Sequence, residues 1–437
     1  MHLFQSLINL VSRYFQTYFG FIRGHSYLSV SDIECLKKLV DTQDSSIVEE
    51  FEKSFSLLIG KGSSVSFATG RMGFYALLKL LNVGKGDEVI ILGHTCSVMP
   101  NAVFRSGAKP IYSDIDPETL GSSAEEIKKV ITSNTKLVVA QHSFGIPCRI
   151  KAIAKICKKE GIFLLEDCAL TLGSKISEVT VGNFGDAALF STDHSKPLNT
   201  ITGGLIYSQD KKIFKSLKNI QKESKSLSKE VKFAIWKNFI EEIKYCNPDN
   251  YGKSFLIKAL LNFFFKNYSS EKEFLNEDFG RTPSKSYPYP ARLPSFLASL
   301  GLKEIERWDE DKKRKKELLS KYLNLMEALN LIKMVPKAYF SKEMDIIPLR
   351  FVILHPEAHK LRKVLDSYIP TNWFWFTQPV QECESGDPKD LGYSIGSCKN
   401  SEKVNELVIN LPCLFNSSYD DIFFSKTSYF LKDSIRN

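Results

Sequence analysis

The stretch "TKLVVAQHSFGIPCRIKAIAKICKKEGIFLLEDCALTLG", residues 135–173, holds two short apolar runs with a longer amphipathic segment between them. The runs at 137–140 and 162–165 are continuously apolar, which is typical of strands buried on both faces. The segment at 149–160 has the length of a crossover helix. A strand, a helix and a second strand in this order predict two parallel strands of an α/β sheet.

The same alternation extends in both directions along the chain. Helical stretches are predicted at 72–82, 97–106 and 122–132, and the other apolar runs are "SVSFATG", "DEVIIL", "KPIYSDI", "DAALFST" and "GGLIYS". We therefore predict an α/β fold, with a mostly parallel seven-stranded sheet covered by helices on both faces. In such sheets ligands bind outside the carboxyl ends of the strands.

The composition changes after residue 208, which suggests four regions. An N-terminal amphipathic helix and arm would occupy 1–44, and the large domain would occupy 45–208. Residues 209–285 are rich in Lys and Phe, with the basic amphipathic segments "KEVKFAIWKNFIEEIKY" and "SFLIKALLNFFFKNY", and they suggest an insertion or lid. Residues 286–437 would form one long charged helix over 302–329 and a smaller α+β C-terminal domain.

The first 24 residues have apolar positions at helical spacing that are interrupted by polar side chains. This pattern is amphipathic and does not predict a membrane-spanning helix. Three interpretations stay open from the sequence: docking in the core or at a dimer contact, an interfacial membrane helix, or a processed signal.

The overall composition is that of an ordinary soluble globular protein, with 437 residues, 43% hydrophobic and 25% charged. The formal charge of +9 favours anionic partners such as phosphorylated metabolites, nucleotide sugars or acidic lipid surfaces, and nucleic acid is not predicted. The nine cysteines include no zinc-type CxxC pair. We therefore predict reduced thiols, a cytoplasmic setting and no metal site.

The strand that runs from Ile162 to Leu165 ends in Glu166 and Asp167, so Asp167 is predicted at the carboxyl edge of the sheet. One interpretation is a helix N-cap. The other is a carboxylate that pairs with a protonated ring nitrogen, as pyridoxal phosphate (PLP) requires for its role as an electron sink.

Lys196 lies in "LFSTDHSKPLNTITGG", residues 189–204, directly past the next predicted strand. A lone lysine in a basic protein is usually a solvated side chain. A Schiff-base lysine, however, needs a site of this kind, where its amine can be kept partly neutral and the loop can turn tightly. Ser191 would be placed to donate a hydrogen bond to a phosphate.

A third feature is "FATGRMGFYALLKLL", residues 67–81, where a strand breaks at Gly70 and a helix begins with Arg71 in its first turn. Backbone N–H groups at a helix N-terminus, with a nearby guanidinium, can hold a phosphate. Such turns are common, but this one adds to the acid and the lysine, each at a predicted strand end. The three together are much more specific than any one of them.

Several segments carry a resemblance to the DegT family of PLP-dependent nucleotide-sugar aminotransferases. The likeness runs from about residue 45 to 207 and includes "LLEDCALTLG" and "FSTDHSKPLNTITGG"; it resumes at "PARLPSFLASLGLKEIERWDEDKKRKKELLSKY" and at "VNELVINLPCLFNSSYDD". The resemblance implies a fold-type I architecture with PLP as cofactor. It also implies a homodimer with active sites at the subunit interface, and glutamate as the amino donor to a keto sugar.

The resemblance also assigns roles to individual positions. It places Lys196 on the lysine that binds PLP covalently and Asp167 on the partner of the pyridine nitrogen. The other cofactor-binding positions that it implies are Ser191, Gly70 and Arg71 at the phosphate, His142 at a strand end, and Arg292 where a partner subunit reaches the site. For His142, a buried structural role is an equal alternative.

Other positions depart from the family pattern. Cys96 stands where an aromatic residue often covers the cofactor ring, so Cys96 or His94 would have to cover that face. Leu170 replaces a polar residue, and Thr192 with Asp193 replaces the usual pair before the lysine. These departures leave open a change of substrate or reaction type.

The function predicted from the resemblance is amine transfer from an amino acid to a nucleotide-linked keto sugar, for the synthesis of a surface polysaccharide or glycan. One alternative is a PLP-dependent sugar dehydratase or deoxygenase of the same family. The other is a non-catalytic protein of the same fold that binds a membrane surface, motivated by the N-terminal segment and the Lys/Phe-rich region. Peripheral contact with the inner membrane surface therefore stays open for a cytoplasmic protein.

Overall fold

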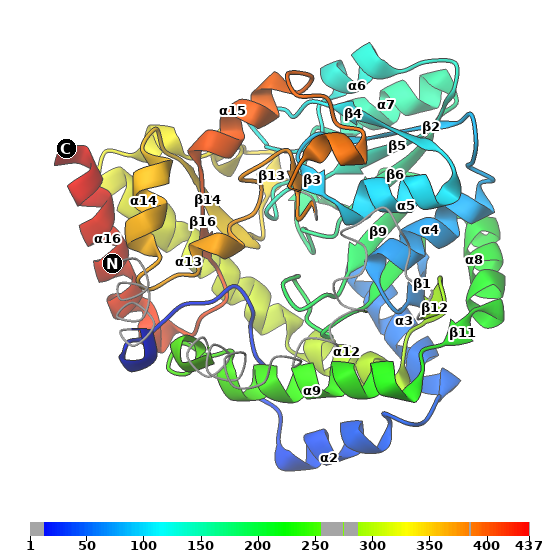
Figure 1. Ribbon diagram of the computed structural model, residues 1–437, viewed down its shortest axis with the longest axis horizontal. Coiled ribbons are helices and arrows are strands. Elements are labelled where there is room, and N and C mark those ends of the chain that lie inside the picture. The colour runs from blue at the N-terminus through cyan, green and yellow to red at the C-terminus, as the bar shows by residue number, and fades with distance from the viewer. Residues whose placement is uncertain (1–12, 255–273, 275–286, 384–385, 437) are drawn as a thin grey trace.

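A central seven-stranded sheet organises the computed structural model, which describes residues 13–254, 274, 287–383 and 386–436 (Figure 1). The strand order is β1-β10-β9-β6-β5-β2-β4. The strands are β1 (Ser63–Phe67), β2 (Glu88–Leu92), β4 (Lys109–Ser113), β5 (Thr135–Gln141), β6 (Phe163–Asp167), β9 (Ala187–Ser191) and β10 (Gly204–Ser208). Only β10 runs against the others, since it pairs antiparallel with both β1 and β9. The predicted mostly parallel sheet is confirmed.

Helices cover both faces of this sheet because its strands alternate between two hydrophobic cores. In β5, Leu137 and Val139 join the core under α3 (Ser45–Ile59) and α4 (Gly70–Leu80), whereas Val138 and Ala140 join the core under α6 (Ala124–Val130) and α7 (Ile150–Glu160). The covering helices are α3 (Ser45–Ile59), α4 (Gly70–Leu80), α5 (Val98–Ser106), α6 (Ala124–Val130), α7 (Ile150–Glu160) and α8 (Lys211–Glu223). The predicted crossover helices are therefore confirmed.

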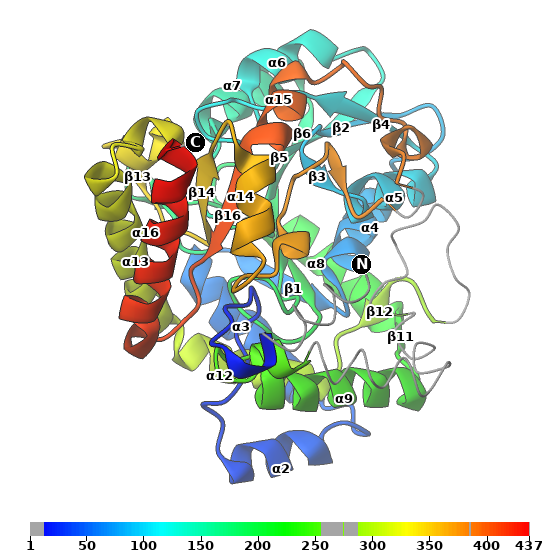
Figure 2. The same ribbon diagram turned by 60° about the vertical axis from the view of Figure 1, so that its left-hand side comes forward.

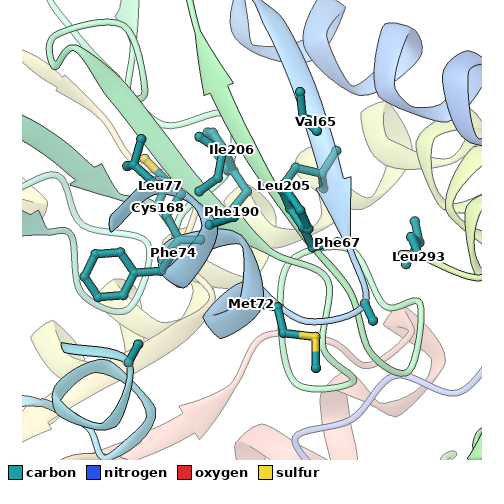
Figure 3. Close-up of a cluster of buried hydrophobic side chains, with 14 of the residues drawn as sticks. Val65, Phe67, Met72, Phe74, Leu77, Cys168, Phe190, Leu205, Ile206 and Leu293 are labelled. Atoms are coloured by element: carbon teal, nitrogen blue, oxygen red, sulfur yellow. The ribbon is translucent and has the colours of Figure 1, made fainter. Parts of the chain in front are cut away.

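The larger core fixes the position of α4 against the strands that precede and follow the lysine loop. Figure 3 shows Phe74 and Leu77 of α4 near Phe190 and Ile206, which come from β9 and β10. Thr69 caps α4, and its Oγ accepts from the N–H of Met72 at 3.2 Å. Packing and capping thus hold the N-terminus of α4 at the end of β9.

A second, smaller core lies in the C-terminal part, at one side of the sheet (Figure 2). It is built on the antiparallel pair β14 (Arg350–Leu354) and β16 (Val408–Pro412). The helices α13 (Trp308–Ala328), α14 (Ala358–Leu365) and α16 (Asp420–Arg436) surround this pair, with α15 (Lys399–Leu407) leading into β16. Tyr322 of α13 stacks on Phe351 of β14 with ring centroids 4.5 Å apart.

The prediction of one long charged helix over 302–329 is wrong. The chain forms α12 (Ser295–Glu306) and α13, which are separated at Arg307. The physical reason is that the two helices serve different cores. Helix α12 packs closely on α3, since a Cβ on Gly301 would lie 2.4 Å from the Phe51 ring, while α13 turns toward the small core with Trp308 buried at the break.

The Lys/Phe-rich region and the arm pack against the rest of the chain where they are described. Helix α9 (Lys229–Tyr245) coincides with the predicted basic helix at 229–245, and it lies beside α12 in both views. The second predicted helix, at 254–268, lies almost wholly outside the described residues. Helix α8 packs on β1 and α4, with Leu217 and Gln221 buried. The four-region division stays a prediction.

Most of the predicted N-terminal helix, residues 1–12, also lies outside the described residues. The arm that follows is docked on the chain itself, because Phe19 packs edge-on against Phe415 and Phe423 at 5.1 and 4.7 Å between ring centroids. A short helix, α2 (Val30–Lys38), then leads to α3. No helix among the described residues is both long enough and apolar enough to cross a bilayer.

Candidate active site

Three predicted site residues meet at one end of the sheet. Asp167 is the last residue of β6 and Ser191 the last of β9, and these strands are parallel neighbours. Gly70 opens α4 beside them, and a Cβ built on Gly70 would lie 3.3 Å from the Ser191 Cβ. The arrangement is the one expected where parallel strands end at a common edge.

Asp167 is a buried carboxylate with one oxygen unused by the described residues. Its Oδ1 accepts from the Ala169 N–H at 2.9 Å, and Oδ2 has no hydrogen-bond partner in the described part of the chain. Burial raises the pKa of Asp167, while the Ala169 N–H, Lys196 and His142 act in the opposite direction. A positively charged hydrogen-bond donor placed at Oδ2 would stabilise the anion.

Backbone packing at the N-terminus of α4 depends on Gly204. A Cβ on Gly204 would lie 2.2 Å from the Gly70 Cα, so a larger residue there would push α4 away from β10. The close approach leaves the first turn of α4 next to the hydroxyl of Ser191. Free N–H groups of a helix N-terminus beside a hydroxyl donor form a cradle that suits a phosphate.

Lys196 is held in a hairpin-like loop between β9 and β10. Backbone hydrogen bonds join Thr192 to Gly203, and Thr200 to Thr192, at 3.0 and 2.8 Å. Within the loop, the Lys196 N–H donates to the Asp193 carbonyl at 2.9 Å. This network fixes the backbone of the loop on both sides of Lys196.

The amine of Lys196 lies among residues that come from several parts of the chain. Its Nζ is 4.6 Å from the ring centroid of Trp375, and its charge acts on both Asp167 and Cys96. The structure therefore brings together the predicted lysine, the predicted acid and Cys96. The Trp375 ring is a further neighbour that the sequence did not single out.

Cys96 and His94 occupy different environments. The Cys96 thiol donates to Glu382 Oε2 at 3.0 Å, and burial together with that carboxylate raises its pKa well above the usual value. His94 packs on Phe376 with centroids 4.3 Å apart, and burial lowers its pKa to about 3. These contacts keep the Cys96 thiol neutral near Lys196. They also keep the His94 ring neutral where it packs against the C-terminal part.

His142 uses both ring nitrogens within the protein. Nδ1 accepts from the Cys148 N–H at 3.0 Å, so Nε2 carries the proton that it shares with Glu166 Oε2 at 3.2 Å. Glu166 also accepts from three backbone N–H groups, those of Gly182, Phe184 and Gly185. These contacts suit the alternative of a buried structural histidine.

Cys168 lies close enough to His142 and Glu166 for the three to be considered as metal ligands. The oxygens of Glu166 are, however, already saturated by N–H donors, and Nδ1 of His142 already accepts a hydrogen bond. The cluster is therefore explained by hydrogen bonding within the fold.

The two predicted arginines lie beside the cradle and contact their own chain. Arg71 Nη2 donates to the Phe274 carbonyl at 2.7 Å. Arg292 belongs to β12 (Ala291–Arg292), and its Nη2 donates to the Ser226 hydroxyl at 3.0 Å. The preceding Ala291 carbonyl accepts from the Ala68 N–H at 3.0 Å, which places β12 next to the strand end before α4.

Leu170 is buried in a separate apolar cluster that includes Phe144 and Phe376. A polar residue there would have to be satisfied within this apolar cluster. The replacement noted in the sequence is therefore consistent with its packing.

A buried carboxylate on α9 holds the lysine loop on both sides of Lys196. Glu242 Oε1 accepts from His194 Nδ1 at 3.1 Å, and Oε2 accepts from Asn199 Nδ2 at 2.8 Å. Burial disfavours a charged His194, but Asp193 and Glu242 outweigh burial and raise its pKa to about 9. His194 and Asn199 thus tie the lysine loop to the Lys/Phe-rich region.

We expect Glu242→Gln to lower the pKa of His194 and to weaken stability in a pH-dependent way. Because the folded pKa is raised, the His194 contribution is complete below about pH 6.5, falls as the pH rises, and is lost above about 9. Solvent screening of the half-exposed ring limits the contribution to about 1 kcal/mol. Thermal unfolding from pH 6 to 10 and imidazole NMR titration measure the effect.

The exposed Glu230 in the first turn of the same helix provides the control, as Glu230→Gln. A stability difference between Glu242→Gln and wild type that did not shrink toward pH 9 would contradict the assignment of this charge pair.

The sequence gives little signal for the site residues that come from the C-terminal part. Trp375 lies in the aromatic-dense "TNWFWF". The pattern is visible, but nothing local connects it with a lysine more than 150 positions earlier. Glu242, in a helix rich in charge, is equally unremarkable by sequence.

Comparison with known proteins places the sequence in one family. The sequence profile of the DegT/DnrJ/EryC1/StrS aminotransferase family matches residues 33–240 and 258–422. GDP-perosamine synthase of Escherichia coli O157:H7 is 32% identical over 181 residues, which are 41% of this chain and 50% of the relative. The chain thus spans about half the length of this curated relative.

Solved structures share the fold over nearly the whole chain. The aminotransferase from Psychrobacter cryohalolentis superposes with a TM-score of 0.68 at 16% identity, covering 94% of this chain and 98% of that one. The PLP-form of Spr1654 from Streptococcus pneumoniae gives a TM-score of 0.66 at 17% identity, covering 92% and 96%. At these identities the likeness is one of fold.

Proposed function

This chain is a member of the DegT/DnrJ/EryC1/StrS aminotransferase family, which is PLP-dependent, and we propose that it transfers an amino group to a nucleotide-linked keto sugar. We expect glutamate as the amino donor. The observation that carries the proposal is the convergence of Asp167, Ser191, Gly70 and Lys196 at one edge of the sheet. A curated relative, GDP-perosamine synthase, bears a name of the same substrate class.

The described residues fit pyridoxal phosphate. The unused Oδ2 of Asp167 offers a partner for a protonated ring nitrogen, and the first turn of α4 with Ser191 offers donors for the phosphate. Lys196 would hold the aldehyde carbon, and the Cys96 thiol lies close enough for the Lys196 charge to act on it. When bound, the cofactor supplies a sink for the electron pair left when the donor loses its α-proton.

The protein residues then have distinct tasks. The amine of Lys196, when it is not bonded to the cofactor, would accept the α-proton of the donor as a general base. Asp167 stays anionic and keeps the ring nitrogen protonated. The hairpin of the lysine loop fixes the backbone from which the Lys196 side chain extends.

We also propose a homodimer, with Arg292 contributing to the site of a partner subunit. The arginine lies in the short β12 beside the cradle, and its Nε has no partner among the described residues. A cytoplasmic location, with peripheral membrane contact left open, remains our expectation. Sedimentation velocity of wild type and Arg292→Ala would measure dimer formation, and amination by glutamate would measure activity. The two measurements together would show whether assembly and activity are separable.

The function is tested by an absorption spectrum of the purified protein loaded with PLP. We expect a visible band from the lysine-bound cofactor that is lost when glutamate is added, as the cofactor becomes aminated, and that returns with 2-oxoglutarate. The dehydratase or deoxygenase alternative predicts no amination by glutamate and a need for an external reductant. A protein that binds no PLP would support the non-catalytic alternative.

A further inference from the structure

The arm at residues 18–28 packs directly against the lysine loop and against the C-terminal end of α9. Asn199 of the loop donates through Nδ2 to the Arg23 carbonyl at 3.0 Å. A Cβ on Gly24 would lie 2.5 Å from the Glu242 carbonyl oxygen, so only glycine allows the arm to approach α9 this closely. The place of the arm beside the loop is therefore fixed by the backbone.

Three alternate residues of the arm face one fully buried carboxylate, that of Glu304 in α12. Arg23 Nη2 donates to Glu304 Oε2 at 2.7 Å, and the Tyr27 hydroxyl donates to Oε1. His25 Nδ1 lies 3.4 Å from the same Oε1. Burial would raise the pKa of Glu304, but these three side chains outweigh burial and hold that pKa well below its usual value. Glu304 is therefore a buried anion whose charge the arm compensates.

The same carboxylate binds the lysine loop, because Glu304 Oε2 also accepts from the Asn199 N–H at 3.1 Å. Glu242 binds this loop from α9, through His194 and the Asn199 amide. His25 lies between the two carboxylates, with its Nε2 3.8 Å from Glu242 Oε2. The imidazole is fully buried, and neither ring nitrogen has a hydrogen-bond partner in the described part of the chain. In this position a positive charge on His25 would stabilise both anions.

The backbone that Asn199 supports has an unfavourable conformation. Ile201 has a φ of 68°, in the left-handed region that β-branched residues rarely adopt. Asn199 Oδ1 accepts from the Ile201 N–H at 2.8 Å, and the Ile201 carbonyl accepts from the His194 N–H at 3.2 Å. Such strain persists only where the surrounding structure holds it, and it is frequent at active sites. Lys196 lies on the segment that these contacts hold, between His194 and Asn199.

We propose that His25 and Tyr27 of the arm are positioning residues for Lys196. They act through the two buried carboxylates and Asn199, which together fix the strained loop that carries the lysine. The proposal rests on the function proposed above, and it assigns the arm a task in that function. A general base must stay within hydrogen-bond reach of the proton that it accepts, so a small displacement of the loop would slow proton transfer.

Tyr27→Phe and His25→Leu test the proposal in the full-length protein, first without cofactor. Hydrogen exchange followed by mass spectrometry would report on peptides that cover the lysine loop, residues 192–203. We expect exchange there to become about 10-fold faster in both variants, because each removes a donor or a counter-charge from the carboxylates that bind Asn199. Peptides of β5 should keep wild-type exchange.

The second measurement is amination by glutamate in the PLP-loaded protein. We expect the rate constant at saturating glutamate to fall about 10-fold in Tyr27→Phe and His25→Leu, while KM for glutamate stays within about 2-fold. The reason is that the loop position affects proton transfer and not the binding of the donor. His25→Gln keeps a group that can donate to a carboxylate, so it should recover part of the rate and of the slow exchange.

Tyr18→Phe is the matched control, because Tyr18 belongs to the same arm and its hydroxyl donates to the Asp366 carbonyl at the end of α14, at 3.2 Å. This variant should leave both the exchange of the lysine loop and the amination rate unchanged.

Three results would overturn the proposal: wild-type amination in Tyr27→Phe and His25→Leu, faster exchange without slower amination, or an equal loss of rate in Tyr18→Phe. If His25→Leu does not fold, Tyr27→Phe decides alone. Failure of the wild type to be aminated by glutamate would instead count against the proposed function.

Discussion

Lys196→Ala is expected to abolish amine transfer and to remove the visible absorption of lysine-bound PLP. The variant lacks both the amine that holds the aldehyde carbon and the base that moves the α-proton. Loss of a general base alone costs about 10²-fold to 10⁴-fold, so we expect turnover to fall by about 10⁴-fold or more. Absorption spectra and single-turnover amination by glutamate measure the two losses separately.

The fold should tolerate this change, because the loop is held by backbone hydrogen bonds and by Glu242, none of which uses the Lys196 amine. Lys155, an exposed lysine of α7, gives the control as Lys155→Ala, which should keep the band and the activity. Small primary amines in the buffer should restore part of the proton transfer to Lys196→Ala. If this variant kept both the band and turnover, Lys196 would not be the cofactor lysine.

The parts of the site that the sequence predicts are those that each follow locally from a strand. Asp167, Ser191 and Gly70 stand directly at strand ends, and parallel strands bring such ends together without any further information. The fold class follows from the same alternation of apolar runs and helices. A pattern that is repeated along the chain is therefore enough to place half of the site.

The remaining part depends on packing between distant segments. Trp375 reaches Lys196 only because the pair β14 and β16 packs beside the sheet, where Asn410 Oδ1 of β16 accepts from the Trp375 backbone N–H. The break at Arg307 has the same origin, since the helical pattern over 302–329 continues through it. The helix ends there because Trp308 is buried in the large core, whereas Leu318 and Tyr322, further along α13, pack in the small core.

The neighbouring carboxylates Glu166 and Asp167 illustrate how strand alternation separates structure from chemistry. They are adjacent in β6, so their side chains leave opposite faces of the sheet. Glu166 is saturated by three backbone N–H groups and His142, while Asp167 has an oxygen to spare. Glu166 thus supports the fold, whereas Asp167 is available to bind a ligand.

Asp167→Asn should reduce turnover by about 10³-fold while the protein stays folded, because an amide cannot keep the ring nitrogen of the cofactor protonated. The amide oxygen can still accept from the Ala169 N–H, so we expect little change in packing. Single-turnover amination by glutamate, compared with PLP affinity, separates the loss of chemistry from a loss of binding. Glu166→Gln is the contrasting variant, since its NH₂ group would face backbone donors and should cost about 2 kcal/mol or more of stability.

The stability of the cofactor-free protein tests independently whether the Asp167 carboxylate supports the fold. Burial raises the pKa of Asp167, so its ionised form destabilises the folded state at neutral pH, and this penalty is relieved as the pH falls through the folded pKa. Asp167→Asn removes the charge and should therefore be at least as stable as wild type at pH 7, with the difference shrinking in acid. A large loss of stability at pH 7 in Asp167→Asn would show that the carboxylate supports the fold, and that its free oxygen is not reserved for a ligand.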